Sequence, residues 1–309
     1  MLDPHSLYAL GDDQPAADEL DRPVLLIALH GFIDAGFAGR LTADHLLRSL
    51  EHSALARFDV DQLYDYRARR PAMTFVEDHW EDYDAPELML RRVRDESGTG
   101  FLMLTGPEPD VQWELFVAAV IELVQRYQVR LSIGMNGIPM AVPHTRPAGM
   151  TAHATRRELV SGFVPWIGRV QVPGNVGGLV ERRLGQAGQD AAGFAVHVPH
   201  YLAQAEYPDA AAALVDAISS LSTLDLPSTA LLAAGAETRA AIAEQVEAQP
   251  EVAAVVSTLE QQYDDFISAR QRSSLLADDA AALPTADELG AELERFLAEE
   301  NERRGRSDG

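Results

Sequence analysis

Short apolar segments of strand length alternate with amphipathic segments over the first two thirds of the chain. The clearest is the uninterrupted apolar run from Val24 to Leu29, which ends at His30-Gly31. A run of this kind is typical of a strand that is buried on both faces, as in a parallel sheet covered by helices. Alternation of such strands with helices predicts a layered α/β fold.

The same patterns predict the remaining elements. Further strands are expected at residues 58–63, 73–76, 101–104, 129–133, 170–172 and 194–198. Helices are expected at residues 35–50, 86–95, 110–127 and 176–187. Asp34 precedes the first of these helices and Asp110 starts the third, and each is expected to cap its helix.

Three segments differ in character. Residues 1–22 are predicted to be an acidic, loosely held leader, residues 23–225 the α/β core domain and residues 226–309 a helical C-terminal extension. Apolar side chains at helical spacing between residues 252 and 267 are expected to cover the parent sheet or a neighbouring subunit, with partner binding as the alternative. A capping box at residues 285–288 predicts one more helix.

The absence of two residue types limits the chemistry. All 25 basic Lys+Arg positions are arginine, and the chain contains no cysteine. This excludes a Schiff-base lysine, the lysine of a phosphate-binding P-loop, a thiol nucleophile, a disulfide and an iron–sulfur cluster. No cofactor is predicted.

The formal net charge of −23 makes nucleic acid or an anionic membrane an unexpected partner. No apolar run approaches the roughly 20 residues of a membrane-spanning helix. The first residues, Met1-Leu2-Asp3-Pro4, do not have the pattern of a secretory signal. These features predict a cytoplasmic protein.

A glycine-rich turn follows the first strand, from His30 to Gly39. It has the strand-turn-helix setting of a phosphate loop, but Phe37-Ala38 stands where that loop requires Lys and Ser or Thr. The turn is interpreted as a close contact between strand and helix, or as a generic anion site at a helix N-terminus.

Histidines and arginines follow the ends of several predicted strands. If those strands are parallel, His30, His144 and His200 share one rim with Arg146, and with Asp65 and Arg67. This group is able to supply acid–base and anion-binding chemistry, or to be a hydrogen-bonded network at the loop bases. The histidine spacing matches no zinc signature, so no metal is predicted.

Five short motifs together resemble the actinobacterial branch of the proteasome assembly chaperone 2 family, over about residues 24–266. They are His30-Gly31-Phe32-Ile33-Asp34-Ala35-Gly36, Asp65-Tyr66-Arg67-Ala68-Arg69-Arg70-Pro71, Gly106-Pro107-Glu108-Pro109-Asp110, Pro143-His144-Thr145-Arg146-Pro147 and Pro199-His200-Tyr201. The resemblance implies a three-layer α/β/α sandwich like that of purine nucleoside phosphorylases and related hydrolases, with helical additions. It also implies homo- or hetero-oligomers, and eukaryotic relatives escort proteasome α-subunits into rings.

Two functions are therefore considered. The first is a non-enzymatic binding protein like a proteasome assembly chaperone, which self-associates and has proteasome α-subunits as a possible partner. The second is a phosphorylase- or hydrolase-like enzyme, or a binder of small anionic ligands, that uses the rim. Residues 303–309 differ from the hydrophobic-Tyr-any tail by which such chaperones dock, which argues against docking by that route. The candidate binding residues are His30, Asp34, Asp65, Arg67, Arg69, Arg70, Glu108, His144, Arg146 and His200.

Overall fold

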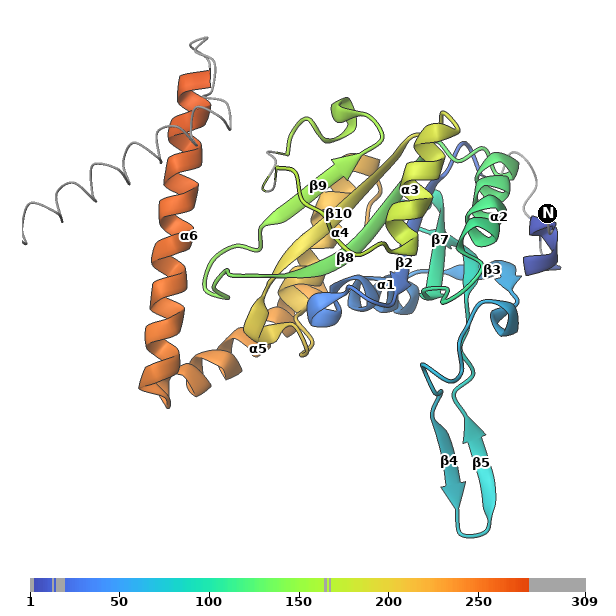
Figure 1. The fold of residues 1–309 in the computed structure, drawn as a ribbon, viewed down its shortest axis with the longest axis horizontal. Helices are drawn as coiled ribbons and strands as arrows, with labels where there is room; N and C mark the ends of the chain where they lie inside the picture. Colours follow the sequence, from blue (N-terminus) through green and yellow to red (C-terminus); the bar gives the residue numbers. More distant parts are fainter. Residues whose placement is uncertain (1–2, 13, 15–19, 164–165, 167, 278–309) are drawn as a thin grey trace, which may run out of the picture. The chain divides into compact units, whose positions relative to one another are not determined.

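An eight-stranded mixed sheet forms the centre of the fold, in the order β1-β3-β6-β7-β2-β8-β10-β9 (Figure 1). The computed structural model describes residues 3–12, 14, 20–163, 166 and 168–277 of the chain. The four central strands β7, β2, β8 and β10 run parallel, and the outer strands are antiparallel to their neighbours. The strands are β1 (Tyr8–Leu10), β2 (Val24–His30), β3 (His52–Phe58), β6 (Met89–Arg94), β7 (Gly100–Pro107), β8 (Leu131–Met140), β9 (Met150–Ala154) and β10 (Ala191–Pro199).

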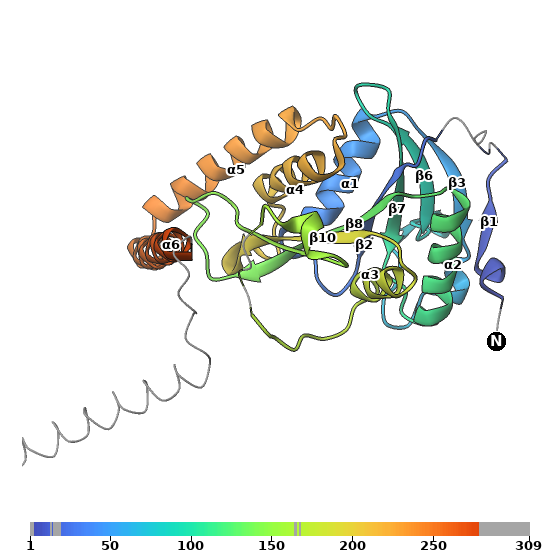
Figure 2. The same ribbon diagram turned by 90° about the horizontal axis from the view of Figure 1, so that it is seen from above.

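Helices cover both faces of the sheet, which confirms the predicted sandwich (Figure 2). One core cluster joins the sheet to α1 and α4, with α5 packed outside through Leu231. The other cluster joins the opposite face to α2 and α3. The helices are α1 (Ala38–Ser49), α2 (Trp113–Arg126), α3 (Val176–Gln186), α4 (Pro208–Ser222), α5 (Thr229–Glu247) and α6 (Pro250–Ala277).

The apolar runs that predicted central strands are β2, β7 and β10, whose residues are almost all buried. A strand with helices on both faces excludes water from all its side chains, so an uninterrupted apolar run is the pattern it requires. Among the helices of the described ranges, none combines the length and apolar character that crossing a bilayer demands.

Two predicted elements were wrong in the half of the sheet before α2. The strand expected at 58–63 is instead β3, which ends at Phe58 and is followed by the 3₁₀ turn η3 (Val60–Gln62). The helix expected at 86–95 is the strand β6, which pairs with both β3 and β7. Leu, Met and Arg in this segment favour a helix locally, but pairing on both sides overrides that preference.

A third error concerns the far edge of the sheet. No strand forms at residues 170–172, where Val170 and Val172 are each 60% exposed. The edge position beside β10 is taken by β9, which the apolar pattern did not predict. Besides Met150, β9 carries one threonine, two alanines and His153 rather than an apolar run, because an edge strand is not fully buried.

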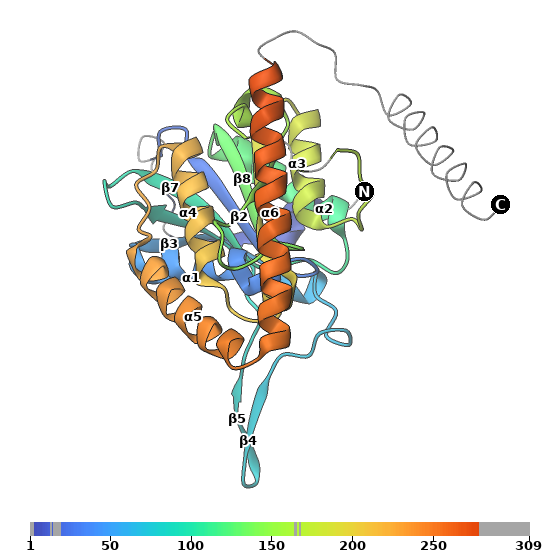
Figure 3. The ribbon, with the colours of Figure 1, turned by 90° about the vertical axis from the view of Figure 1, so that its left-hand side faces the viewer.

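Two strands do not join the main sheet. β4 (Met73–Val76) and β5 (His79–Tyr83) pair only with each other and form an arm that extends away from the sheet (Figures 1 and 3). All residues of β5 are exposed, as are three of the four in β4. The strand expected at 73–76 is thus confirmed, in a hairpin rather than in the core.

The ends of the chain contribute to the fold as well. Part of the segment expected to be loosely held is ordered: β1 pairs with β3, and Leu7 is fully buried against the α2 side of the core. The chain divides into two compact units, residues 1–260 and 261–309. The boundaries expected at residues 22 and 225 stay predictions. The capping box at 285–288 and the terminal 303–309 segment lie outside the described residues.

Candidate functional site

The carboxyl ends of the four parallel strands lie at one edge of the sheet. β2 ends at His30, β7 at Pro107, β8 at Met140 and β10 at Pro199. Ligands of open α/β sheets bind beyond this edge, which is where the predicted site residues follow in the chain. The topology therefore puts them along one rim, and their side chains decide what the rim can do.

A cleft of about 1130 Å³ opens at this rim next to the end of β2. Its walls come from the loop after β2, the start of α1, the segment after η3 and the base of the β4–β5 arm. Among the predicted site residues, His30, Asp34 and Arg69 line it. Further polar or aromatic lining residues are Phe32, Phe37, Arg40, Tyr64, Asp84, Glu87 and Gln204.

His30 is exposed at the end of β2 and lines the cleft. Desolvation of its ring by the surrounding protein lowers its pKa from the ordinary value of 6.5, and the Arg40 guanidinium lowers the pKa further. A neutral imidazole has one donor and one acceptor nitrogen. His30 thus offers the cleft hydrogen bonds rather than a positive charge at neutral pH.

Asp34 fastens the first turn of α1 to the sheet. Its Oδ1 accepts hydrogen bonds from the backbone N–H groups of Gly39 (2.8 Å) and Gly137 (3.0 Å), and its Oδ2 accepts one from Arg40 N–H (3.0 Å). The carboxylate thus satisfies amides that α1 leaves open, although Phe37 and not Asp34 occupies the N-cap position of α1. A Cβ atom at Gly137 would meet the carbonyl oxygen of Ala35 at 2.1 Å, so the close approach of this loop to β8 requires glycine.

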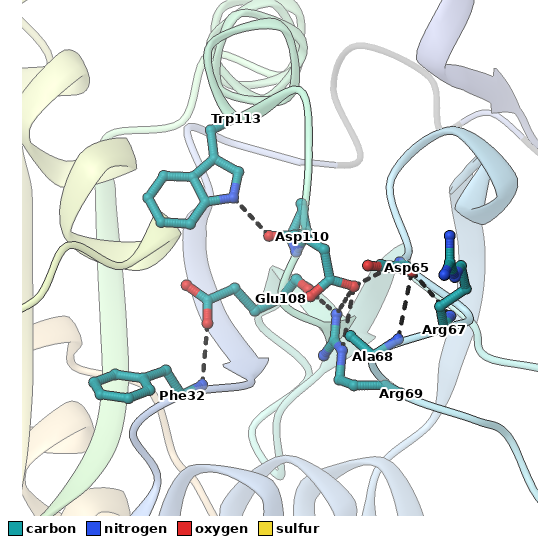
Figure 4. Close-up of polar contacts among 9 residues, drawn as sticks. Phe32, Asp65, Arg67, Ala68, Arg69, Glu108, Asp110 and Trp113 are labelled. Carbon is teal, nitrogen blue, oxygen red and sulfur yellow. Dashed lines mark hydrogen bonds and ion pairs between the residues drawn. The ribbon is translucent and has the colours of Figure 1, made fainter.

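Asp65, Arg69 and Asp110 form one polar network on the rim (Figure 4). Asp65 folds its own loop, because its Oδ1 accepts a hydrogen bond from Arg67 N–H (2.9 Å). Asp110 Oδ2 accepts from Asp65 N–H (2.7 Å) and from Arg69 Nη2 (2.6 Å). The Arg69 guanidinium also lies 4.5 Å from the centre of the Tyr64 ring.

The expected role of Asp110 as a helix cap was wrong. Helix α2 begins at Trp113, and Gln112 occupies the capping position in a left-handed backbone conformation. Because the helix starts three residues later than predicted, the Asp110 carboxylate is directed to the loop of Asp65 instead (Figure 4).

Glu108 bridges three segments of the rim. Its Oε1 accepts a hydrogen bond from Val176 N–H (2.6 Å) at the start of α3. Its Oε2 accepts one from Phe32 N–H (3.1 Å) after β2 (Figure 4). Its backbone carbonyl accepts one from Arg69 Nη2 (2.6 Å). A Cβ atom at Gly31 would lie 2.2 Å from Oε2, so this carboxylate position requires glycine there.

Arg67 and Arg70, the other two arginines of this motif, are exposed. Neither lines the 1130 Å³ cleft. The basic cluster of the sequence therefore separates into one half-buried arginine that braces the rim, Arg69, and two on the surface.

His144 is buried after β8 and contacts Tyr201. Its backbone N–H donates to the Tyr201 hydroxyl (2.9 Å), and its Nδ1 lies 2.8 Å from the same oxygen. Desolvation by burial lowers the pKa of His144, although the carboxylates of Glu260 and Asp209 act in the opposite direction. The ring is thus held neutral and connects two loops.

Arg146 lies near His144 but pairs with α6. Its Nη1 is 3.2 Å from Glu260 Oε1, which also accepts a hydrogen bond from the Thr145 hydroxyl. His144 and Arg146 line a smaller pocket of about 350 Å³, whose opposite wall includes Asp209 and Arg239. These two form an ion pair across the α4–α5 contact.

The structure does not bring His30, His144, Arg146 and His200 together in one cavity. His30 lines the larger cleft, whereas His144 and Arg146 line the smaller pocket. His200 is exposed, with its ring edge-on to that of Tyr201. The parallel strands end at one edge of the sheet. The loops after β8 and β10 nevertheless place His144, Arg146 and His200 at a different part of that edge from His30.

Several residues of the rim were missed by the sequence reasoning. Tyr201 follows His200 in a motif but gave no sign that it would bind His144, and Arg40 and Tyr64 stand outside the motifs. Only their proximity in the fold reveals them. In the described part of the chain, no three His, Asp or Glu side chains are grouped so as to hold a metal ion.

The fold and the braced rim define a class of protein. A proteasome-assembly chaperone homologue from Mycobacterium tuberculosis has the same fold, with a TM-score of 0.70 and 24% identity over 75% of this chain and 99% of its own. The family model described as "PAC2 family" matches residues 28–246. The chain therefore belongs to the PAC2 family.

Two actinobacterial structures have higher sequence identity. A Mycobacterium tuberculosis protein of unknown function is 50% identical, with a TM-score of 0.83 over 87% of this chain and 92% of its own. A Corynebacterium glutamicum protein of unknown function is 36% identical, with a TM-score of 0.81 over 84% of this chain and 98% of its own. Among curated proteins, no match was found.

Proposed function

We propose that this chain is a non-enzymatic binding protein that acts in the manner of a proteasome-assembly chaperone, with proteasome α-subunits as its partner. Family membership supports the class of function, since one relative is described as a proteasome-assembly chaperone homologue. The charged motif residues Asp34, Arg69 and Glu108 support it too, because each makes hydrogen bonds that hold loops together. Such residues serve a scaffold better than they serve acid–base chemistry.

The observation that carries the proposal is the exposed apolar face of the β4–β5 arm. Cross-strand partners share a face of a hairpin, and so do residues two apart on one strand. Phe75 pairs with Trp80, and Met73 pairs with Tyr83, so all four side chains lie on the same face. They are 45–63% exposed, and the Phe75 and Trp80 rings meet edge-on with centres 5.0 Å apart.

The opposite face of the arm is more polar, with Thr74 paired to Asp82 and Val76 paired to His79. Acidic residues are concentrated there and at the tip and base, while residues 72–88 contain no arginine. A large exposed apolar patch rimmed by charge marks a protein interaction site. The partner surface is thus apolar with a basic margin.

Native mass spectrometry of the full chain with the host's proteasome α-subunits tests this proposal. The double substitution Phe75→Ser with Trp80→Ser is expected to abolish the complex. Thr74→Ala with His79→Ala, on the other face of the same arm, is the matched control and is expected to retain it. Both variants change exposed side chains only, so thermal unfolding checks that each remains folded.

The outcomes separate the two predicted partners. A complex with α-subunits that depends on the apolar face supports the proposal. A homo-oligomer that depends on this face, with no α-subunit complex, assigns the arm to self-association and overturns the chaperone-like role. Retention of every complex by the Phe75, Trp80 variant overturns the role of the arm.

The alternative function, an enzyme or a binder of small anions, stays a prediction. The 1130 Å³ cleft is its strongest support, since His30 and Arg40 line it. The separation of His144 and Arg146 from this cleft counts against a shared catalytic group. A thermal-shift screen with phosphate, nucleosides and nucleotides tests it, with Arg40→Gln as the variant that removes the response.

A further inference from the structure

A third cavity lies between α3 and the sheet. Its volume is about 330 Å³. Leu29 of β2, Gly134 of β8, Thr151 of β9 and Ala195 of β10 line one side, and Val180 of α3 lines the other. It is distinct from the His144 pocket and meets the rim cleft at two shared lining residues, Ile33 and Ile138.

Small residues in neighbouring strands create this cavity. Alternate residues of β8 point to the α3 side, and there they are Ser132, Gly134 and Asn136. The adjacent strand β10 contributes Ala191 and Ala195. A Cβ atom at Gly134 would have a single neighbour within 4 Å, the carbonyl oxygen of Ala192 at 3.9 Å. Protein interiors are normally close-packed. The space above this central strand therefore results from the small side chains at these positions.

Ser132 supplies an unpartnered polar group at this face. The residue is 2% exposed, and its hydroxyl makes no hydrogen bond within the described ranges. Buried hydroxyls almost always have a partner, and leaving one without costs free energy. A molecule in the cavity that carries a hydroxyl or carbonyl group would provide that partner after a small adjustment of the Ser132 rotamer.

The charged residues around the cavity favour binding of an uncharged molecule over binding of an ion. Glu108 and Glu181 are the carboxylates that line it, and the lining residues of the described chain include no arginine. Glu108 is held by two backbone amides, and Glu181 lies 2.8 Å from His153 Nδ1. An anion would be repelled, and a cation would find both carboxylates already engaged.

We propose that this cavity binds a small, uncharged, mostly apolar molecule with one hydrogen-bonding end that reaches Ser132. Its volume is at the lower limit of known ligand pockets, which suits one ring or a short chain. Val170 and Val172, both 60% exposed, line it and connect it to the surface.

Three probes of nearly equal size test the proposal: benzyl alcohol, toluene and benzoate. Binding to the full chain is measured by ligand-observed NMR, with dissociation constants from titration. Benzyl alcohol is expected to bind more tightly than toluene, by about two- to tenfold, because one hydrogen bond is added. Benzoate is expected not to bind. Equal binding of benzoate and benzyl alcohol would overturn the proposal.

Two substitutions locate the site. Gly134→Val places a side chain in the open space and is expected to weaken benzyl alcohol and toluene by at least about tenfold. Ser132→Ala is expected to weaken benzyl alcohol to the level of toluene and to leave toluene unchanged. Gly162→Val is the control, because Gly162 is exposed with nothing within 4 Å of its added Cβ.

Thermal unfolding accompanies each titration. Gly134→Val is expected to be at least as stable as the parent chain, since valine favours a strand and fills a void. If Gly134→Val does not fold, Gly134→Ala takes its place with a smaller expected loss of binding. Unchanged affinities in both the glycine variant and Ser132→Ala would refute the site.

Discussion

Arg69 and Asp110 form an ion pair in which Nη2 lies 2.6 Å from Oδ2, and this pair joins the loop after η3 to the loop after β7. Both side chains are about 30% exposed. The same carboxylate oxygen accepts the backbone N–H of Asp65, so the pair also fixes a turn. Two residues of the sequence motifs, Arg69 and Asp110, thus form a contact between loops.

This pair is expected to be strongly coupled. In a double-mutant cycle of Arg69→Ala and Asp110→Ala, each single change should cost about 1–3 kcal/mol, with a coupling of about 1 kcal/mol or more. Urea unfolding measures it. The exposed pair Arg57 and Glu87, at 2.7 Å, is the control, with an expected coupling near 0–1 kcal/mol. Equal coupling in both pairs would contradict the bracing role.

Glu108→Gln is expected to destabilise the protein by about 1–3 kcal/mol. Both carboxylate oxygens accept backbone N–H groups, so the amide NH₂ of glutamine faces a donor wherever it is placed. Denaturant unfolding gives the change in free energy, and amide hydrogen exchange at Phe32 and Val176 shows where it acts. A stability equal to that of the parent chain, with both amides still protected, would refute this prediction.

Burial of His144 gives the stability a pH dependence below 6.5. Because the folded-state pKa lies below that value, the unfolded chain takes up this proton first as the pH falls. The free energy of unfolding is therefore expected to decrease as the pH is lowered from 6.5 toward the folded-state pKa, and this contribution is fully present only above 6.5. His144→Gln removes that part of the slope. An NMR titration of His144 with a midpoint at or above 6.5 would contradict it.

The importance of the shared apolar face of the β4–β5 arm can be tested without replacing any of its four apolar side chains. The hairpin register shifts between Thr74 and Phe75, so Glu81 is an extra residue that lets Trp80 and Tyr83 share a face. Deleting Glu81 regularises the hairpin and keeps them together. Inserting one alanine between Thr74 and Phe75 also regularises it but separates Met73 and Tyr83 from the aromatic pair.

We therefore expect the deletion to retain the proposed complex with α-subunits and the insertion to lose it. Native mass spectrometry measures both, and circular dichroism confirms that the sandwich is intact. Equal behaviour of the two variants would show that the shared apolar face is not what the partner recognises.

The central part of the fold could be predicted because its strands are buried on both faces. The runs at residues 24–29, 101–104 and 194–198 carry the required pattern by themselves. β6 could not be predicted, since its strand conformation depends on pairing with β3 and β7, which are distant from each other in the sequence. β9 was missed because an edge strand needs only a partial apolar pattern.

The sequence was sufficient to predict which residues lie at the rim, but not which side chains contact one another there. His30 ends β2 and Glu108 follows β7, and these strands are neighbours in the sheet, so the sequence order places both residues at the rim. The attachment of His144 to Tyr201 depends on two loops meeting beyond the sheet, and no local pattern encodes that. The cavity under α3 was invisible for a similar reason: small residues in separate strands create it together.

The low stability of the isolated β4–β5 hairpin also affects the lifetime of any complex that it forms. β4 and β5 pair only with each other, and a lone two-stranded hairpin is marginally stable in water. Its amides should exchange with solvent far faster than those of β2 or β7. A partner that orders the arm spends part of its binding free energy in doing so, which shortens the lifetime of the complex. If the proposed partner binds this arm, the hairpin that makes the contact is also the element whose low stability favours release.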